Sequence, residues 1–311
     1  MGIRSSQALR AWMLAAATTV VAASGMALAP SAQAAEAGPV LDKLRRGEPL
    51  VIAHRESSVP FSFVQAGQAQ PVGYAIDLCL KVAESVRASL GLKALPVRWK
   101  LVTGANRIEA IQTHQADIEC GSTTNNAERR EKVAFTVPHY ITGARMLVPA
   151  ASRVAELTDL EGKRLVSTKG TTPMKAVSSA NRERMLNIQV LEAPDHARAL
   201  DMVVRGEADA FAMDDVLLYG LIASQPDPAK FKVVGKMFTI EALAMMLPKD
   251  DPAFKRLVDE EMKRLIRSRE AHAVYERWFM QPIPPRQQVL NLPMNYLLKD
   301  FWKYPTDELF N

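Results

Sequence analysis

Apolar positions along the chain alternate between strand-like and helix-like spacing. "PLVIAHRE", from Pro49, predicts a strand, and "FSFVQAGQAQPVGY" predicts a hairpin around Gly67. Apolar residues between Ile76 and Leu90 then recur at helical spacing, and Gly91 follows as a helix-ending residue. "VRWKLV", "NRIEAIQTH" and "ADIECG" continue as strand, helix and strand. This alternation predicts α/β units around a largely parallel sheet.

A second set of elements follows the 138–143 region. "GKRLVST" predicts a strand, "KGTT" a tight turn, and "PMKAVSSANRERML" a helix with Pro173 near its first turn. "IQVLEA", "DHARALDMVVRG", "ADAFAMDD" and "VLLYGLIA" add a strand, a helix, a strand and a helix. The two sets predict two similar lobes.

One short correspondence between the two sets points to a shared site. "QADIECGS" and "EADAFAMD" both place Ala-Asp before an apolar strand, and the sixth residue after the alanine is polar: Ser122 in one and Asp214 in the other. Ligands of open α/β sheets bind beyond the carboxyl ends of the strands. We therefore expect Ser122 and Asp214 to face one cleft from equivalent strand ends.

The first residues have the features of an export signal. Arg4 and Arg10 precede an apolar run over 11–29, and "SAQA" provides small residues before a cleavage point after Ala34. We expect 1–34 to be a signal peptide; a membrane anchor is the alternative, since about 18 apolar residues can span a bilayer.

Composition and charge limit which partners and cofactors are expected. The formal net charge is +5, and removing Arg4 and Arg10 gives 5 − 2 = +3. No Lys/Arg cluster with interleaved aromatics accompanies this mild excess, so nucleic acid is not expected as a partner. The five histidines are scattered, so we expect no metal site and no cofactor. Whether Cys79 and Cys120 pair stays open, with a slight expectation of free thiols.

Six segments together carry a family resemblance: "HRESSVPFSF", "NRIEAIQTHQADIECGSTTNNAER", "GTT", "DH", "MDD" and "WFMQPIPP". The chain from about 41 to 311 resembles the periplasmic glutamate/aspartate-binding proteins of polar amino-acid ABC transporters, solute-binding protein family 3. The run over 106–130 is the most specific part. The resemblance implies a two-lobed periplasmic binding protein fold that closes on one amino acid.

The resemblance also implies how the chain is divided. Lobe 1 would comprise 41–141 and 238–311, and lobe 2 would be the insertion 142–237. Each lobe would be a mostly parallel sheet flanked by helices. Two crossing hinge strands, near 140–145 and 235–239, would join the lobes.

The resemblance assigns ligand binding to seven residues: Arg55, Arg107, Ser122, Thr124, Thr172, His196 and Asp214. Two arginines and one aspartate match an acidic amino acid, which has two carboxylates and one ammonium. The planar fork of arginine suits bidentate recognition of a carboxylate.

We assign each ligand group to residues accordingly. Arg107, with Thr124, would hold the α-carboxylate, while Asp214 and Ser122 would hold the α-ammonium. The remaining three residues, Arg55 among them, would hold the side-chain carboxylate.

Each of these residues also has an ordinary structural interpretation. Arg55 and Arg107 fit surface ion pairs, and Asp214 fits a solvated helix N-cap. His196 fits a first-turn histidine, and Thr172 fits the cap of the helix that Pro173 begins. Ser122 and Thr124 fit plain turn residues.

Two positions depart from the family pattern. Gly104 stands where the family commonly has a serine that reaches the side-chain carboxylate, so affinity and the choice of acid stay open. We expect serine at position 104 to tighten acidic ligands. Met245 stands where the family can carry a cysteine, so any bridge to Cys120 must use Cys79.

We expect a monomeric periplasmic binding protein that delivers glutamate or aspartate to the permease subunits of an ABC importer. A protein for another polar amino acid such as glutamine is the nearest alternative, but a neutral ligand would leave Arg55 without a counter-charge. An exported enzyme on the same fold and a detached receptor module are less favoured alternatives. His196 is the one plausible catalytic base, and no nucleophile elbow is present. The sequence does not rank glutamate against aspartate or identify the docking surface.

Overall fold

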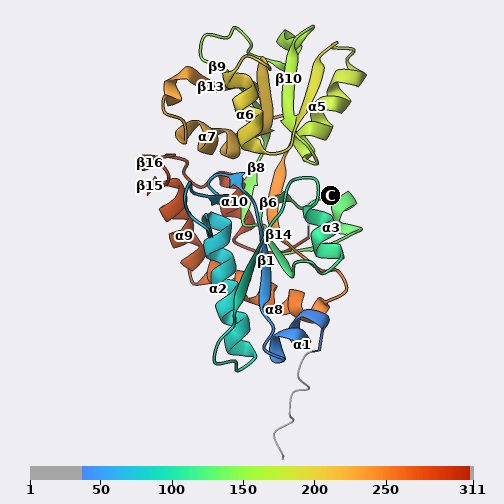
Figure 1. Cartoon of the computed structure of the whole chain (residues 1–311), viewed down its shortest axis with the longest axis vertical. Helices are drawn as coiled ribbons and strands as arrows, with labels where there is room; N and C mark the ends of the chain where they lie inside the picture. The colour runs from blue at the N-terminus through green and yellow to red at the C-terminus, as the bar shows by residue number, and fades with distance from the viewer. Residues whose placement is uncertain (1–36, 309–311) are drawn as a thin grey trace, which may run out of the picture. The chain divides into compact units, whose positions relative to one another are not determined.

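Two β-sheets covered by helices organise the described part of the chain (Figure 1). The computed structural model describes residues 37–308, so the expected signal peptide over 1–34 lies outside the described residues. The helices are α1 Pro39–Arg45, α2 Tyr74–Ser89, α3 Arg107–Gln112, α4 Ala127–Arg130, α5 Thr172–Glu183, α6 His196–Val204, α7 Asp215–Ala223, α8 Pro252–Arg267, α9 Glu270–Phe279 and α10 Tyr296–Phe301.

The first sheet has the strand order β5-β1-β6-β14-β7, and β8 also pairs with β14. Its strands are β1 Leu50–His54, β5 Val97–Leu101, β6 Ile118–Thr124, β7 Ala134–Phe135, β8 Tyr140–Thr142 and β14 Glu241–Leu247. β1 is parallel to β5 and β6, and β14 is antiparallel to its neighbours. Every residue of β1 and β6 is buried, which is typical of strands covered on both faces.

The second sheet has the order β11-β10-β12-β9-β13, with β10 parallel to β11 and β12, and β9 antiparallel to its neighbours. Its strands are β9 Ala144–Pro149, β10 Arg164–Thr168, β11 Gln189–Ala193, β12 Ala210–Asp214 and β13 Phe231–Val234. The minor elements are β2 Ser57–Ser58, β3 Ser62–Val64, β4 Pro71–Val72, β15 Pro282–Ile283, β16 Gln288–Val289 and the 3-10 helices η1 Leu157–Leu160 and η2 Pro228–Lys230. The predicted α/β class with two lobes is confirmed.

The chain passes between the two sheets twice, from β8 to β9 and from β13 to β14. The two crossing segments are bonded to each other. Phe238 N donates to Ala144 O, and Ala144 N donates to Thr239 Oγ1, both at 3.0 Å. A Cβ built on Gly143 would lie 2.4 Å from Thr239 O, so glycine permits this close approach. The lobe limits at 141/142 and 237/238 stay a prediction.

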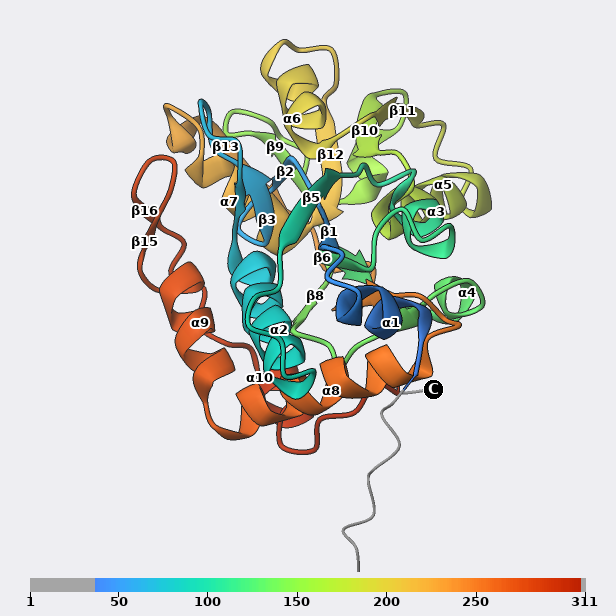
Figure 2. The ribbon, with the colours of Figure 1, turned by 60° about the horizontal axis from the view of Figure 1, so that its bottom comes forward.

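Helices α8 and α9 follow β14 and return to the first sheet, where they pack against α2 (Figure 2). α2 begins at Tyr74, two residues before the predicted helix, and Gly91 follows it with φ +64°, as the helix-ending role requires. α3 covers the opposite face of the sheet, beside β6 and β14. Within 37–308, the structure contains no helix with the length and apolar character that crossing a membrane requires.

A disulfide joins Cys79 of α2 to Cys120 of β6, with the Cα atoms 6.3 Å apart. The expectation of free thiols is therefore wrong. α2 packs directly on β6, which brings the two buried cysteines into bonding range. The Sδ atom of Met245, on the neighbouring β14, lies 3.6 Å from Cys79 Sγ.

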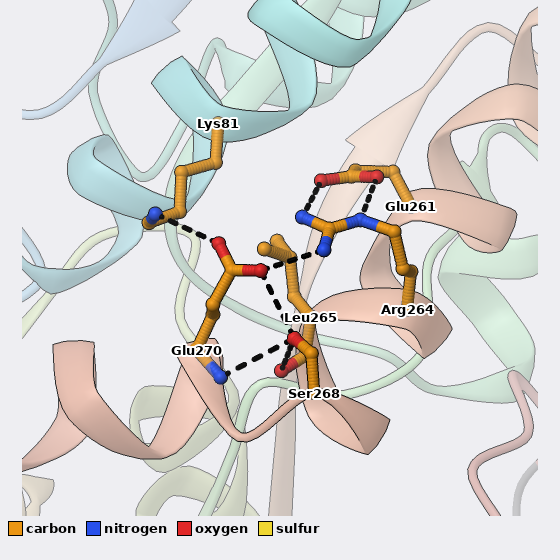
Figure 3. Close-up of polar contacts among 6 residues, drawn as sticks. All are labelled: Lys81, Glu261, Arg264, Leu265, Ser268 and Glu270. Carbon is orange, nitrogen blue, oxygen red and sulfur yellow. Dashed lines mark hydrogen bonds and ion pairs between the residues drawn. The ribbon is translucent and has the colours of Figure 1, made fainter.

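A network of ion pairs fastens the α8–α9 junction to α2 (Figure 3). The Glu270 carboxylate accepts hydrogen bonds from Arg264 at 2.6 Å, Lys81 at 3.1 Å and Ser268 at 3.0 Å. Arg264 also donates twice to Glu261, at 2.8 Å. These bonds, Arg264 first, lower the pKa of Glu270 to about 2.

The disulfide gives a first prediction. Replacing both Cys79 and Cys120 with alanine should lower the free energy of unfolding by about 4 kcal/mol, because the bond closes a loop with a sequence separation of 41 residues. Urea denaturation of the wild type and the double variant measures the change. Thiol counting on the denatured, unreduced wild type is the control: two free thiols would contradict the pairing.

The Glu270 network gives a second prediction. Because the folded-state pKa is depressed below the ordinary 4.5, the stabilisation is complete above about pH 4.5 and is lost as pH falls toward about 2. Glu270→Gln should lower the melting temperature at pH 7 by about 1–4 °C, since its pairs are partly exposed. The gap to wild type should shrink at pH 3. Glu276→Gln, on the exposed side of the same helix, is the matched control, and a gap independent of pH would argue against the ion pairs.

Candidate functional site

Four of the predicted site residues lie at strand ends. Arg55 directly follows β1, Ser122 and Thr124 are among the last three residues of β6, and Asp214 is the final residue of β12. All four are buried. The carboxyl ends of parallel strands thus carry them, as the strand-end rule predicts.

The other three predicted residues begin helices. Arg107 is the first residue of α3 and is 2% exposed. His196 is the first residue of α6, after Asp195, whose carboxylate accepts from Arg198 N at 2.9 Å. Thr172 is the first residue of α5, but the cap is Thr171, which accepts from Met174 N. The interpretation of Thr172 as the helix cap is therefore wrong.

Hydrogen bonds join the site residues of the two sheets. The hydroxyls of Thr124, on β6, and Thr172, on α5, lie 3.1 Å apart. Thr172 Oγ1 also donates to Glu241 Oε2 at 2.7 Å. Arg107 Nη2 donates to Gly170 O at 3.3 Å, in the turn between β10 and α5. The site residues thus belong to one continuous region.

Three further charged residues of this region were not predicted. Arg129, in α4, donates from Nη1 to Thr124 O at 2.9 Å and from Nη2 to Gly170 O at 3.2 Å. Glu241 begins β14 and is 2% exposed. Glu119 is the second residue of β6 and is fully buried. A glutamate inside the apolar strand "ADIECG" was the one sequence signal for this group.

Glu119 lies beside the first arginine. A Cβ built on Gly121 would lie 2.3 Å from Glu119 Oε1 and 3.1 Å from Arg55 Cγ, so both side chains occupy the space above this glycine. Burial raises the pKa of Glu119, and the charges of Arg107 and Arg55 oppose the rise. Glu119 is therefore an internal counter-charge for the arginines.

Burial dominates the electrostatics of the arginines. Burial lowers the pKa of Arg107 well below its ordinary value, and the like charges of Arg129 and Arg55 add to this effect. Burial also lowers the pKa of Arg55, against the opposing charges of Glu119 and Asp195. Three cations in one buried region repel each other, so an anion between them is favoured.

The electrostatics of Asp214 are opposite to those of the arginines, because its surroundings disfavour a negative charge. Burial raises its pKa well above the ordinary value, and the negative charges of Glu241 and Asp215 raise it further. Arg129 and Arg107 offset only part of this. Asp214 takes the N-cap position of α7 but makes no capping bond, and it is 3% exposed. The interpretation as a solvated cap is therefore wrong.

His196 is held as a neutral imidazole. Burial lowers its pKa well below the ordinary value, and the charges of Arg55 and Arg107 lower it further. Its Nδ1 lies 2.8 Å from the Thr168 hydroxyl. If that hydroxyl donates to Nδ1, the opposite ring nitrogen is a hydrogen-bond donor.

Several buried polar atoms of the site have no hydrogen-bond partner among residues 37–308: Arg55 Nη1, Arg107 Nε, Ser122 Oγ, His196 Nε2, Asp214 Oδ1 and both carboxylate oxygens of Glu119. Leaving a buried polar group unpaired costs about 1–3 kcal/mol. Such groups therefore indicate a binding site when they cluster. The donors suit anionic groups and Asp214 suits one cation.

A cavity of about 720 Å³ adjoins this region, between α5, the start of β14 and α10. Thr124, Thr172 and Glu241 are among its lining residues, whereas Arg55 and Asp214 are not. The bonded threonines and Glu241 thus border the cavity. In the part of the chain that the structure describes, His, Cys, Asp and Glu side chains form no cluster suited to a metal ion.

Comparison with known sequences gives consistent relatives. The family model of bacterial extracellular solute-binding proteins, family 3, matches residues 50–281. The L-glutamate/L-aspartate-binding protein of Pseudomonas aeruginosa is 39% identical over 86% of this chain and 89% of its own length. The glutamate/aspartate import solute-binding protein of Escherichia coli is 37% identical over 93% of this chain and 95% of its own length.

Solved structures support the fold. An ancestral arginine-binding protein bound to arginine superposes with a TM-score of 0.67, at 22% identity over 74% of this chain and 98% of that one. At this identity the likeness concerns the arrangement of the backbone.

The raised pKa of Asp214 gives a third prediction. A carboxyl whose folded-state pKa is raised destabilises the fold above that pKa, and the penalty disappears below about pH 3.8. Asp214→Asn should therefore raise the melting temperature of the ligand-free protein at pH 7.5 by about 2–4 °C, and by less at pH 5.

Asp209→Asn is the control of opposite sign. Burial opposes ionisation there, but hydrogen bonds from Arg164 outweigh it and lower the pKa of Asp209, so this variant should melt lower than wild type. An Asp214→Asn protein that melts at or below the wild-type temperature at pH 7.5 would show that the buried carboxylate does not destabilise the fold.

Proposed function

Because the chain belongs to the bacterial extracellular solute-binding proteins of family 3, we propose that it captures glutamate or aspartate between its two lobes and delivers it to the membrane permease of an ABC importer. The buried cluster of Arg55, Arg107 and Arg129, each with its positive charge near Asp214, carries this proposal. The names of relatives that are 37–39% identical over most of the chain support it.

The charges match an acidic amino acid group by group. Such a ligand brings two carboxylates and one ammonium to a region that has three arginines and one aspartate whose ionised form is disfavoured by burial. The carboxylates offset the repulsion between the guanidinium groups, and the ammonium offsets the repulsion that Glu241 and Asp215 exert on Asp214. Bidentate guanidinium–carboxylate pairs add geometric selectivity.

The geometry favours a different division of the ligand groups from the one expected from sequence. Arg129 is bonded to Thr124 and lies in the field of Glu241 and Asp214, so we assign Arg129 and Thr124 to the α-carboxylate. Asp214 keeps the α-ammonium, with Ser122, whose hydroxyl is free to accept. Thr172 then completes the α-carboxylate side through its contact with Thr124.

The side-chain carboxylate goes to the other arginines. The charges of Arg55 and Arg107 both lower the pKa of His196, so we assign the side-chain carboxylate to these three residues. A neutral imidazole can donate one hydrogen bond without adding a fourth charge. A neutral ligand such as glutamine would leave this pair of arginines without a counter-charge, at a cost of several kcal/mol.

The proposal is a binding role rather than catalysis. His196 is the plausible base of the site, and its Nδ1 is engaged with Thr168. The relatives' names describe binding and import. We further propose export through the leader over 1–34 to the periplasm, and action as a monomer that meets the permease with its ligand bound.

The fourth prediction tests the ligand and its division between the arginines. Titration calorimetry of the wild type should show glutamate or aspartate as the tightest ligand among the common amino acids. Arg55→Met should weaken that ligand by about 10²–10³-fold, since breaking a buried charge pair costs about 3–5 kcal/mol. It should also reduce the preference for glutamate over glutamine.

Arg129→Met should instead weaken all amino acids and leave that preference unchanged, because the α-carboxylate is common to them. The exposed Arg153 provides the matched control, Arg153→Met, which should bind like wild type. Wild-type preference for a neutral or basic amino acid would refute the proposed ligand, and an unchanged preference in Arg55→Met would refute the division.

A further inference from the structure

A hairpin near the end of the chain reaches a helix of the second lobe. Its strands β15 and β16 pair with each other, and β15 packs against α9 on the side of the first sheet. Figures 1 and 2 both show this hairpin beside α7. Arg286, in the turn between its strands, donates from Nε to Ser224 O at 2.9 Å. We call the hairpin over 282–289 the strap.

The strap meets α7 at its C-terminal end, because Ser224 is the C-cap residue of that helix. The last carbonyl groups of a helix lack partners within it and carry partial negative charge, so an arginine is a favourable donor to them. In the described part of the chain, Arg286 makes no other hydrogen bond or ion pair. Pro285, beside it, lines a cavity of about 720 Å³ together with Leu221 and Ser224. The strap therefore contacts the end of α7 through both polar and apolar groups.

The other end of α7 is bonded to a segment that crosses between the sheets. Thr142 Oγ1 donates to Asp215 Oδ1 at 2.6 Å, and Asp215 N donates to Gly143 O at 2.9 Å. The helix has 9 residues. At 1.5 Å per residue it is about 13 Å long, so a rotation of about 10° at the crossing segments moves its far end by about 2 Å. A displacement of this size is enough to break the Arg286 bond.

A glycine within α7 provides a second contact with the first lobe. A Cβ built on Gly220 would lie 2.3 Å from Val59 O, in the turn between β2 and β3. Glycine inside a helix is less favourable than alanine, so the close approach of Val59 is a physical reason for it. Gly220 and Ser224 are thus the two points at which α7 contacts elements on the side of the first sheet.

We propose that Arg286 is a positioning residue for ligand capture: the strap holds the C-terminal end of α7, and with it the second lobe, in the closed arrangement. Asp214 lies at the opposite end of α7, so the strap acts on closure and not on a ligand group. It therefore slows the release of every ligand by the same factor. The inference rests on the proposed function, in which the lobes close on an amino acid.

Two substitutions of the exposed Arg286 separate its hydrogen bond from its bulk. Arg286→Met removes the donor, and Arg286→Lys keeps a charged donor of the kind that can bond the last carbonyls of a helix. In stopped-flow measurements, Arg286→Met should release glutamate and aspartate about 3–10-fold faster than wild type, as expected for the loss of one hydrogen bond. Arg286→Lys should release them at an intermediate rate. Gln288→Met, on the exposed β16 of the same hairpin, is the matched control and should behave like wild type.

Gly220→Ala tests the second contact independently. Its Cβ meets Val59 O only while α7 lies against the turn between β2 and β3, and alanine otherwise favours the helix. Titration calorimetry should therefore show at least tenfold weaker binding of the wild-type ligand, while the ligand-free protein melts no lower than wild type. A lower melting temperature of the ligand-free variant would indicate a purely structural role for this contact and would contradict the proposal.

The ratio between ligands decides how the strap acts. Arg286→Met should leave the preference between glutamate and aspartate unchanged, because the strap lies away from the ligand groups. A wild-type release rate in Arg286→Met, or a change confined to one of the two acids, would overturn the proposal. Wild type that binds neither acid would instead refute the proposed function, so the two failures are distinguishable.

Discussion

Six charged side chains are buried together where the two sheets meet: Arg55, Arg107, Glu119, Arg129, Asp214 and Glu241. Burying charges is costly unless they compensate one another. Here the compensation is incomplete, because burial depresses the pKa of the arginines and raises the pKa of Glu119 and Asp214. The surrounding apolar cores hold these charges together. A ligand that has both positive and negative groups would compensate them best.

The surrounding scaffold is built so that these charges come from separate parts of the chain. β1 and β6 supply Arg55 and Glu119, β12 supplies Asp214, and β14 supplies Glu241. Thr172 connects the second sheet to Glu241 and Thr124 of the first. A relative movement of the sheets therefore changes the hydrogen bonding of the site directly, which is the requirement for coupling ligand capture to closure.

Local patterns predicted most of the strands and helices between 49 and 223, but not β14, α8 or α9, which follow them. Ser122 and Asp214 follow from the rule that sites form at the carboxyl ends of strands, whereas Arg55 followed only from the family resemblance. Arg129 and Glu241 did not follow, because their place in the site depends on how α4 and β14 pack, which no local pattern encodes. The cysteine pairing depends in the same way on α2 lying against β6. The cap of α5 was misplaced by one residue, which is a common uncertainty of helix boundaries.

The strand order of the first sheet has a consequence for how the protein is made. β14 lies between β6 and β7, although it follows them by more than a hundred residues, and the second sheet is complete before β14 is reached. During synthesis, the first sheet therefore lacks an inner strand until residue 247 has emerged, and its cover of α8 and α9 comes later still. Pairings between such distant segments form slowly. A chain with this order remains incompletely folded through most of its synthesis, which is compatible with the export proposed above.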